Sequence, residues 1–412
     1  MENFKMWLTL LALTPASLSS APVRSFGAQE AFTFASDLQA TDDGGVVVVG
    51  RTQGSLAAPA QGPGSGDAFM VRLDAQGRTL WARQWGSTGK EEATSVVRDG
   101  EGFWAAVQHN GAEGLGELGL KGYSSAILRI NGEGEVERAF SVPALIEDIV
   151  LTSEGELVLC GARITPQSGA ADFFLAQHAP DGRQRWAQVP SAPETDEHCR
   201  SVYAHAGGVV ATGRAMSPIL EAKATPMPGL RSEDEILGGL LTTSVSAAGR
   251  VQWSHLVAGQ RFGWGQQVVV DAAGDAWVAA SFEHIGASPN RTEAALLRFS
   301  PTGHAQLVHA VDMVNSERTR DDLVLHGESL IWSVGLPHRA PEGLPAAELV
   351  MSGVRGGEVG PWVAVDALRR GARIYPAEEG LLLLGLTCQA TPFHAPSPYQ
   401  GCDPAVRALP LP

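Results

Sequence analysis

One short pattern repeats along most of this 412-residue chain. An apolar run leads into a turn string that ends in glycine, and a second apolar run follows, often with a tryptophan. The clearest copy is Asp67–Gly86 (DAFMVRLDAQGRTLWARQWG), and weaker copies return at intervals of about 50 to 65 residues. These weaker copies are Ser124–Ser141, Ala171–Val189, Leu240–Val257 and Ala294–Val311. Repeats of short strands and tight turns with this length are typical of a β-propeller, in which each repeat forms one blade.

Each repeat contains four expected strands, which we label a to d. In the first repeat they are Ala35–Ala40, Val46–Arg51, Ala68–Leu73 and Thr79–Trp85. The b strand of each repeat is an apolar run that often ends in glycine, as expected for a strand buried on both faces. These b strands start at Val46, Phe103, Leu157, Val209, Ala276, Leu330 and Leu381, which predicts seven blades.

The last repeat has no d strand of its own, and the N-terminal segment supplies the missing piece. Val23–Ala35 aligns with Trp81–Ser95, so that Arg24-x-Phe26-Gly27 matches Arg83-x-Trp85-Gly86. An N-terminal strand in this place would close the ring and remove its open edges. We therefore predict an all-β fold, a single seven-bladed β-propeller of four-stranded blades closed by the N-terminal strand.

The first residues have the pattern of a secretory signal. Lys5 precedes the apolar run Met6–Leu13, and Pro15 with small residues follows. We predict a signal peptide over residues 1–21 and the propeller over residues 22–412. The expected location is secreted, periplasmic or at the cell surface. We expect no membrane span, because no long apolar stretch follows the leader. We also expect a monomer.

Four cysteines without CxxC spacing predict two disulfides in an exported chain. Cys160 lies near the end of one b strand and Cys199 begins the next a strand, at the same end of neighbouring blades. Cys388 ends a strand and Cys402 begins the next one of the same repeat. The expected pairs are therefore Cys160–Cys199 and Cys388–Cys402.

Charge and motifs exclude several functions. The formal net charge of −15 argues against nucleic acid as a partner, because phosphate binding needs a basic face. No GxSxG, HExxH, P-loop or EF-hand pattern is present. We expect no catalytic residue, no cofactor and no metal site.

The Gly62–Gly86 string and its degenerate copies resemble the bacterial secreted β-propeller repeats often called SBBP repeats. The resemblance implies fold and export, and it brings no general activity or catalytic residues. Leu73–Trp81 (LDAQGRTLW) also resembles the Asp-box of sialidase-like propellers and the tryptophan repeats of quinoprotein dehydrogenases, where such strings are structural. A sialidase would need an arginine cluster. Arg51, Arg163 and Arg214 recur just after b strands, but the other blades lack an equivalent.

The two faces of the predicted ring differ. The a–b and c–d turns, on one face, are short, whereas the b–c connections on the other face are long and varied in composition. The longest, Ala215–Ile236, carries Arg231, Glu233 and Asp234, and Trp85 and Trp264 lie near d–a connections of the same face. We interpret these residues as a candidate ligand surface. The alternative is a solvated insertion and, for the tryptophans, packing between blades.

These observations favour an exported, non-catalytic module that binds or scaffolds an unknown protein or polysaccharide through its b–c loop face. One alternative is a carbohydrate-active enzyme of glycosidase or lyase type that uses acidic loop residues. A second alternative is a structural envelope spacer with no ligand.

Overall fold

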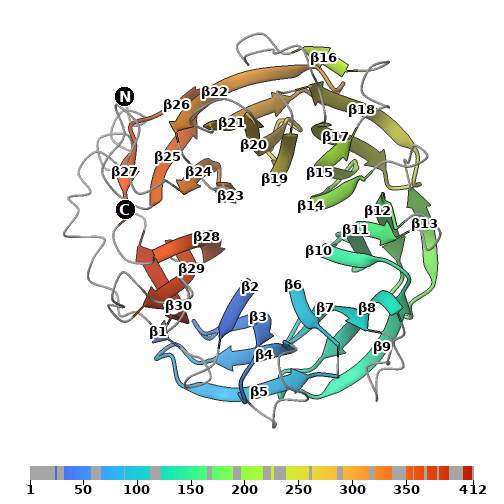
Figure 1. Cartoon of the computed structure of the whole chain (residues 1–412), viewed down its shortest axis with the longest axis vertical. Coiled ribbons are helices and arrows are strands. Elements are labelled where there is room, and N and C mark those ends of the chain that lie inside the picture. The colour runs from blue at the N-terminus through green and yellow to red at the C-terminus, as the bar shows by residue number, and fades with distance from the viewer. Residues whose placement is uncertain are drawn as a thin grey trace.

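The strands form seven sheets arranged in a ring around a central axis, as Figure 1 shows for this computed structural model. The structure describes residues 24–25, 32–56, 66–87, 89–111, 122–164, 169–188, 196–216, 224–226, 238–258, 262–284, 291–314, 321–335, 349–355, 357–365, 369–377, 380–388 and 402–410. Among these residues there are strands and turns but no helix. Accordingly, no helix in this part of the chain is long and apolar enough to cross a membrane.

The first three blades each contain four antiparallel strands in chain order. Blade 1 consists of β2 (Thr33–Ala40), β3 (Val46–Thr52), β4 (Asp67–Leu73) and β5 (Thr79–Trp85). Blade 2 consists of β6 (Glu91–Asp99), β7 (Gly102–Gly111), β8 (Gly122–Ile130) and β9 (Val136–Val142). Blade 3 consists of β10 (Leu145–Leu151), β11 (Leu157–Ile164), β12 (Ala171–His178) and β13 (Gln184–Gln188).

Blades 4 to 6 keep this order, with additions at two outer edges. Blade 4 consists of β14 (His198–His205), β15 (Gly208–Met216), β17 (Gly238–Ser246) and β18 (Val251–Ala258), and β16 (Ala224–Pro226) pairs with β18 in parallel. Blade 5 consists of β19 (Phe262–Val270), β20 (Ala276–His284), β21 (Arg291–Phe299) and β22 (Ala305–Val314). Blade 6 consists of β23 (Asp321–His326), β24 (Ser329–Gly335) and β25 (Leu349–Arg355), with the short β26 (Glu358–Val359) and β27 (Val363–Ala364) both paired to β25.

The ring closes at blade 7 as the sequence predicts. This blade contains β28 (Arg369–Ala377), β29 (Gly380–Cys388) and β30 (Cys402–Pro410), and β1 (Arg24–Ser25) is its outermost strand. Arg24 and Ser25 pair with Val406 and Ala405 of β30. The N-terminal strand thus joins the two ends of the chain within one sheet.

The same tight turn recurs at the ends of the a–b and c–d hairpins. In the c–d turn of blade 1, the Asp74 N–H bonds the Arg78 carbonyl and the Gly77 N–H bonds the Asp74 carbonyl, both at 2.9 Å. The glycine has a positive φ, 81° for Gly77, which a residue without a Cβ adopts at no steric cost. This is the three-residue hairpin loop with a glycine bulge, and it explains why the repeat string ends in glycine.

In blades 1, 3 and 4, a tryptophan of the outer strand contacts the c–d turn of the next blade. The ring of Trp81 in blade 1 covers Gly134 of blade 2, and its Nε1–H donates to the Gly132 carbonyl at 2.8 Å. Trp186 and Trp253 make the same contact with the next blades, through bonds to Ala247 O at 3.3 Å and Pro301 O at 3.1 Å. Between blades 2 and 3, Arg138 makes the bond, to Pro180 O, and Phe140 covers Gly182. The tryptophan of the repeat is therefore a contact between blades.

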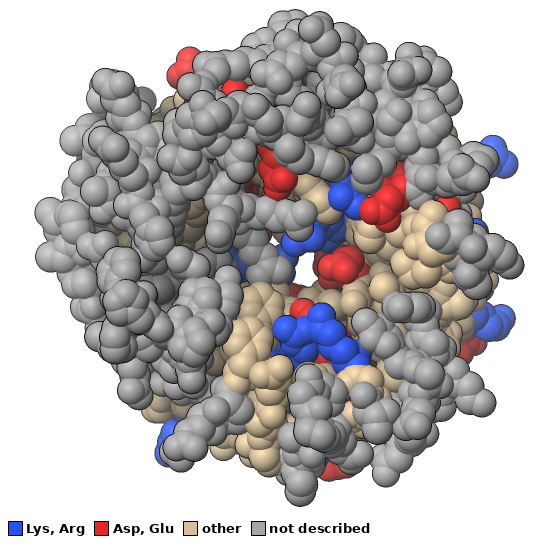
Figure 2. All heavy atoms as spheres, viewed as in Figure 1, with Lys and Arg blue, Asp and Glu red and all other residues tan. Residues whose placement is uncertain are grey.

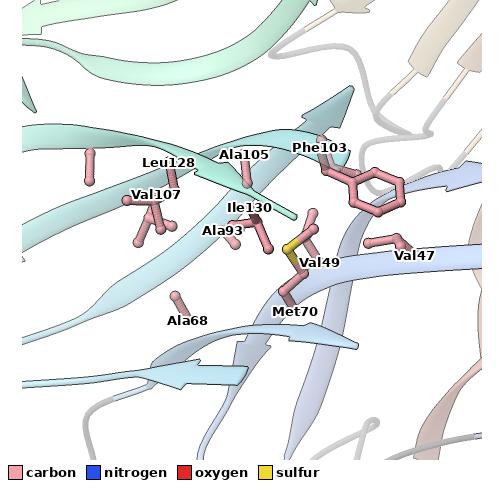
Figure 3. Close-up of a cluster of buried hydrophobic side chains, with 12 residues drawn as sticks. Val47, Val49, Ala68, Met70, Ala93, Phe103, Ala105, Val107, Leu128 and Ile130 are labelled. Atoms are coloured by element: carbon pink, nitrogen blue, oxygen red, sulfur yellow. The ribbon is translucent and has the colours of Figure 1, made fainter. Parts of the chain in front are cut away.

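The core consists of layers of apolar side chains between neighbouring blades. In the layer drawn in Figure 3, Val47, Val49 and Met70 of blade 1 pack against Ala105 and Leu128 of blade 2. All five are fully buried. Because the b strands have buried side chains on both faces, each blade needs a neighbour on either side to exclude water.

The predicted disulfide between blades 3 and 4 is confirmed. Cys160 of β11 and Cys199 of β14 are bonded, with a Cα–Cα distance of 5.3 Å, and both are fully buried. A bridge that spans 39 residues stabilises the folded state by about 4 kcal/mol through restriction of the unfolded chain. Cys388 and Cys402 are directly opposite each other in β29 and β30. This register suits a disulfide. The side chains of both cysteines lie outside the described residues, so the second disulfide stays a prediction.

The glycine contacts predict unequal effects of two alanine substitutions. A Cβ on Gly134 (φ 85°) would lie 2.7 Å from Trp81 Cδ2, whereas one on Gly155 (φ 76°) would meet nothing within 4 Å. We expect Gly155→Ala to lower the unfolding free energy by about 1 kcal/mol through backbone strain. Gly134→Ala adds a steric clash, and we expect a further loss of about 2 kcal/mol. Urea unfolding of both variants checks this, and equal losses would contradict the proposed contact.

Cysteine labelling tests the second disulfide. If both predicted pairs are oxidised, as we expect, no thiol in the denatured, unreduced protein will react with iodoacetamide. Intact-mass spectrometry counts the adducts. Two adducts that map to Cys388 and Cys402 would show that only the bridge between blades 3 and 4 forms.

Candidate functional site

The chain direction defines two faces of the ring. The inner strands begin, and the second strands end, on the face that carries the b–c and d–a connections, which we call the loop face. The tight turns lie on the other face, the turn face. Figure 2 shows acidic and basic side chains gathered around the central opening. A candidate site must therefore be sought on the inner strands and at the loop-face ends of the strands beside them.

Polar side chains midway along the inner strands connect the blades around the channel. In β2, β6, β10 and β14 a one-residue bulge precedes the polar residue that bonds the next blade, whereas β23, which carries Asp322, has no bulge. Asp37 accepts a hydrogen bond from Val96 N–H (2.8 Å), Ser95 from Ile149 N–H (3.3 Å), Asp148 from Val202 N–H (3.0 Å), Ser201 from Val268 N–H (3.3 Å) and Asp322 from Ile374 N–H (2.9 Å). We call these five acceptors the inner ring.

Arg373 makes a different bond where the ring closes, between blade 7 and blade 1. Its Nη1 donates to the Ser36 carbonyl at 2.8 Å and lies 3.9 Å from Asp37 Oδ1. Its side chain is 19% exposed and that of Asp37 is 12% exposed, so water screens this pair little. Arg373 therefore fastens the C-terminal blade to the first one.

The carboxyl groups of Asp37 and Asp148 in the channel already accept hydrogen bonds from the next blade. Burial raises the pKa of Asp37, although Arg373 and the Val96 N–H oppose the shift. Burial likewise raises the pKa of Asp148, to about 6, against the Val202 N–H. Because both carboxyl groups bond backbone amides of the next blade, we assign them a structural role.

The three recurring arginines do not form an arginine cluster. Arg51 Nη1 lies 3.8 Å from Glu92 Oε2 of blade 2, and Arg163 Nη2 lies 3.6 Å from Asp172 Oδ2 of its own blade. Arg214 Nη2 bonds Asp196 Oδ2. Each guanidinium thus has its own carboxylate partner on the loop face.

Arg214 differs from the other two because it also lies over a tryptophan. Its guanidinium carbon is 4.0 Å from the ring centre of Trp264, which lies near the start of β19, the inner strand of blade 5. The Asp196 carboxylate holds Arg214 through one oxygen and His198 Nε2 through the other, at 3.1 Å. The side chains of Asp196 and His198 are 46% and 31% exposed. We call Asp196, His198, Arg214 and Trp264 the blade 4–5 cluster.

Glycines in the sequence FGWG allow this arrangement. A Cβ on Gly265 would lie 2.0 Å from Thr212 Oγ1, and one on Gly263 would lie 2.8 Å from the Leu240 nitrogen. The absence of side chains at these positions lets β19 approach blade 4 closely. As a result, Trp264 lies within reach of Arg214.

A second polar group is enclosed between blades 1 and 2. His109 Nδ1 lies 2.9 Å from Glu91 Oε1, and both side chains are fully buried. The N–H of Ser87 donates to the other Glu91 oxygen at 3.0 Å, and the Ser87 hydroxyl bonds Oε1. Since this histidine and carboxylate have no exposed surface, we do not treat them as a ligand site.

The structure separates the predicted ligand residues. Trp264 belongs to the blade 4–5 cluster, whereas Trp85 is half-buried against the apolar layer between blades 1 and 2. Arg231, Glu233 and Asp234 lie outside the described residues, as do most residues of the long b–c connections. Of the longest connection, Ala224–Pro226 lies on the outer edge of blade 4 as β16. In the described part of the chain, no group of three or more His, Cys, Asp or Glu could hold a metal ion.

Sequence reasoning missed the inner ring and Arg373, although a signal for them exists. The motifs SDL, TSV, EDI, RSV, DDL and ARI recur at the middle of the a strands, with a polar residue before an aliphatic one. In the first four motifs a bulge turns the second residue toward the next blade, whereas DDL on β23 lies in a regular ladder. The blade 4–5 cluster has no comparable signal, because its members come from separate segments.

Comparisons with known proteins leave the family open. No protein-family model matches the chain, and no curated protein matches it. A chain of the Drosophila plexin A complex with semaphorin 1b is 10% identical, with a TM-score of 0.47, over 95% of this chain and 88% of that chain. The Fusarium graminearum α-L-arabinofuranosidase is 7% identical, with a TM-score of 0.46, over 95% of this chain and 98% of that one.

The α-L-arabinanase of Penicillium chrysogenum is similar at the same level: it is 9% identical, with a TM-score of 0.44, over 77% of this chain and 92% of that chain. Similarity this low carries no argument about function. The chain is a seven-bladed β-propeller. The resemblance to SBBP repeats is confirmed in its fold and not in its family.

Removal of the closing arginine should weaken the ring. Arg373→Met leaves the Asp37 carboxylate and the Ser36 carbonyl without this donor, and we expect a loss of about 3 kcal/mol in unfolding free energy. The control is Arg183→Met on the turn face, where arginine and Asp181 side chains are 70% and 46% exposed. For this exposed pair we expect a change below about 0.5 kcal/mol. Thermal and urea unfolding measure both, and similar small changes would contradict the role of Arg373.

Proposed function

We propose that this chain is an exported, non-catalytic module that binds or scaffolds a protein or polysaccharide through its loop face. The difference between the two faces supports this proposal. On the turn face, aromatic side chains of the preceding blade cover the c–d turns of blades 2 to 5. On the loop face, long connections of different composition meet the ends of the inner strands.

The single observation that carries the proposal is the blade 4–5 cluster. Tryptophan and arginine are the residue types that dominate binding energy at protein interfaces. Here the ion pair with Asp196 and the contact with Trp264 hold the arginine in one position before any partner arrives. A side chain that is already fixed loses little conformational entropy on binding. We therefore propose this cluster as the centre of the binding surface, with Arg231, Glu233 and Asp234 of the neighbouring insertion as further contacts.

The disulfide supports export. Buried disulfides such as Cys160–Cys199 form in oxidising compartments, in agreement with the signal sequence predicted over residues 1–21. We propose a secreted, periplasmic or cell-surface location for a protein without a cofactor.

Binding of the purified protein tests the proposal. We would screen bacterial and plant glycans on an array and, in parallel, identify proteins retained from an envelope extract. The proposal expects one saturable partner, with an affinity that Trp264→Ala lowers at least about tenfold through loss of a rigid aromatic contact. Titration calorimetry with the identified glycan or protein measures the loss.

Leu80→Ser is the matched control, because Leu80 is 51% exposed near a turn-face hairpin far along the chain from the cluster. This variant should bind like the wild type. Equal loss in both variants would contradict a site at the blade 4–5 cluster. Hydrolysis of a bound glycan would overturn the proposal and favour a carbohydrate-active enzyme. No binding in either screen would favour a structural envelope spacer.

A further inference from the structure

One hydroxyl group in the channel lies between two carboxyl groups. Ser95 Oγ of β6 is 3.0 Å from Asp37 Oδ2 of β2 and 3.1 Å from Asp148 Oδ1 of β10. It also accepts a hydrogen bond from the Ile149 N–H at 3.3 Å. Ser95 therefore links three consecutive blades.

The number of protons available at this hydroxyl limits its bonds. A serine hydroxyl has one proton to donate and two lone pairs to accept with. One lone pair takes the Ile149 N–H, and the proton goes to one carboxylate. The contact with the other carboxyl group is a hydrogen bond only if that carboxyl group carries a proton itself and donates it to Ser95.

The surroundings indicate that Asp148 carries this proton. Asp37 Oδ2 already accepts the Val96 N–H, its Oδ1 accepts the Leu38 N–H at 2.9 Å, and Arg373 lies 3.9 Å away. These donors favour the ionised form of Asp37. Among the hydrogen bonds of the described residues, Asp148 Oδ1 takes part in one, the bond with Ser95.

We propose that Asp148, Ser95 and Asp37 form a proton-dependent latch that holds blades 1, 2 and 3 together at the channel. In its closed form, the Asp148 carboxyl group donates to Ser95, and Ser95 donates to the Asp37 carboxylate. Loss of the proton leaves two carboxylates beside one donor, and one of the two contacts becomes repulsive. The contact between these blades is then weaker.

The charged groups around the latch agree with a proton at this place. The pKa of Asp148 is raised to about 6, because burial and the negative charge of Asp37, which raise it, outweigh the Val202 N–H and Arg373 on β28, which lower it. Tyr375, also on β28, and Asp322 on β23 act on Arg373 in turn. The neighbouring strands β6 and β14 contribute the Ser95 hydroxyl and the Val202 N–H to Asp148.

The direction of the pH effect follows from this raised pKa. The folded protein binds the Asp148 proton more tightly than the unfolded chain, whose aspartates titrate near pH 4. The latch therefore adds most stability in acid, and its contribution falls as the pH rises from about 4 to about 6. Above that range the contribution stays low.

Asp148→Asn imitates the closed form at every pH. The asparagine oxygen accepts the Val202 N–H, and its NH₂ group donates to Ser95 as the protonated carboxyl group does. We expect the ratio of the unfolding equilibrium constants, wild type over variant, to rise about tenfold between pH 5 and pH 8. Urea unfolding of the full chain at both pH values measures this ratio.

The control is Asp271→Asn in an a–b turn of blade 5, whose side chain accepts the N–H groups of Ala273 and Asp275. Its ratio should be the same at pH 5 and pH 8. Hydrogen exchange adds a local readout on the folded protein. At pH 8, peptides that cover Ile149 and Val202 should exchange more slowly in Asp148→Asn than in the wild type, and at pH 5 equally. A constant ratio for Asp148→Asn, or equal exchange at pH 8, would overturn the proposal.

Discussion

The contact between neighbouring blades is the interaction on which the rest of this structure depends. A b strand such as Val46–Thr52 has buried side chains on both faces of its sheet, so a single blade would leave one apolar face in water. Only a closed ring gives every blade two neighbours. This requirement explains the use of Arg24–Ser25 as the last strand, since an open ring would expose the apolar faces of blades 7 and 1.

Two sets of directional contacts fix how the blades lie against each other. At the outside, an aromatic ring covers the turn glycine of the next blade, as Trp81 covers Gly134. At the channel, the inner ring accepts backbone N–H groups of the next blade. The polar residues at the centre of the molecule are therefore engaged in assembly. For this reason the site that we favour for a ligand lies at the loop-face ends of blades 4 and 5 rather than within the channel.

Much of the fold could be predicted because its signals are local. A turn string such as Asp74–Gly77 and the apolar run before it lie within one hairpin, and repetition reinforces both. The pairing of Cys160 with Cys199 followed from the position of each cysteine in its repeat, and the structure confirms it. The candidate site could not be predicted in the same way. Trp264 and Arg214 are adjacent only because Gly263 and Gly265 let two blades approach, and the Asp37–Ser95–Asp148 chain joins residues from three separate repeats.

The sequence by itself determined the type of blade, the number of blades and the way in which the ring closes, because strand and turn patterns act over a few residues and recur. Only the tertiary structure decided which polar side chains meet. The bulges of the inner strands turn Asp37, Ser95 and Asp148 toward neighbouring blades, and although their motifs recur in the sequence, only the closed ring shows that these three side chains meet. The hydrogen bonds, ion pairs and shifted pKa values at the channel arise from distances between blades, which exist only after the ring has closed.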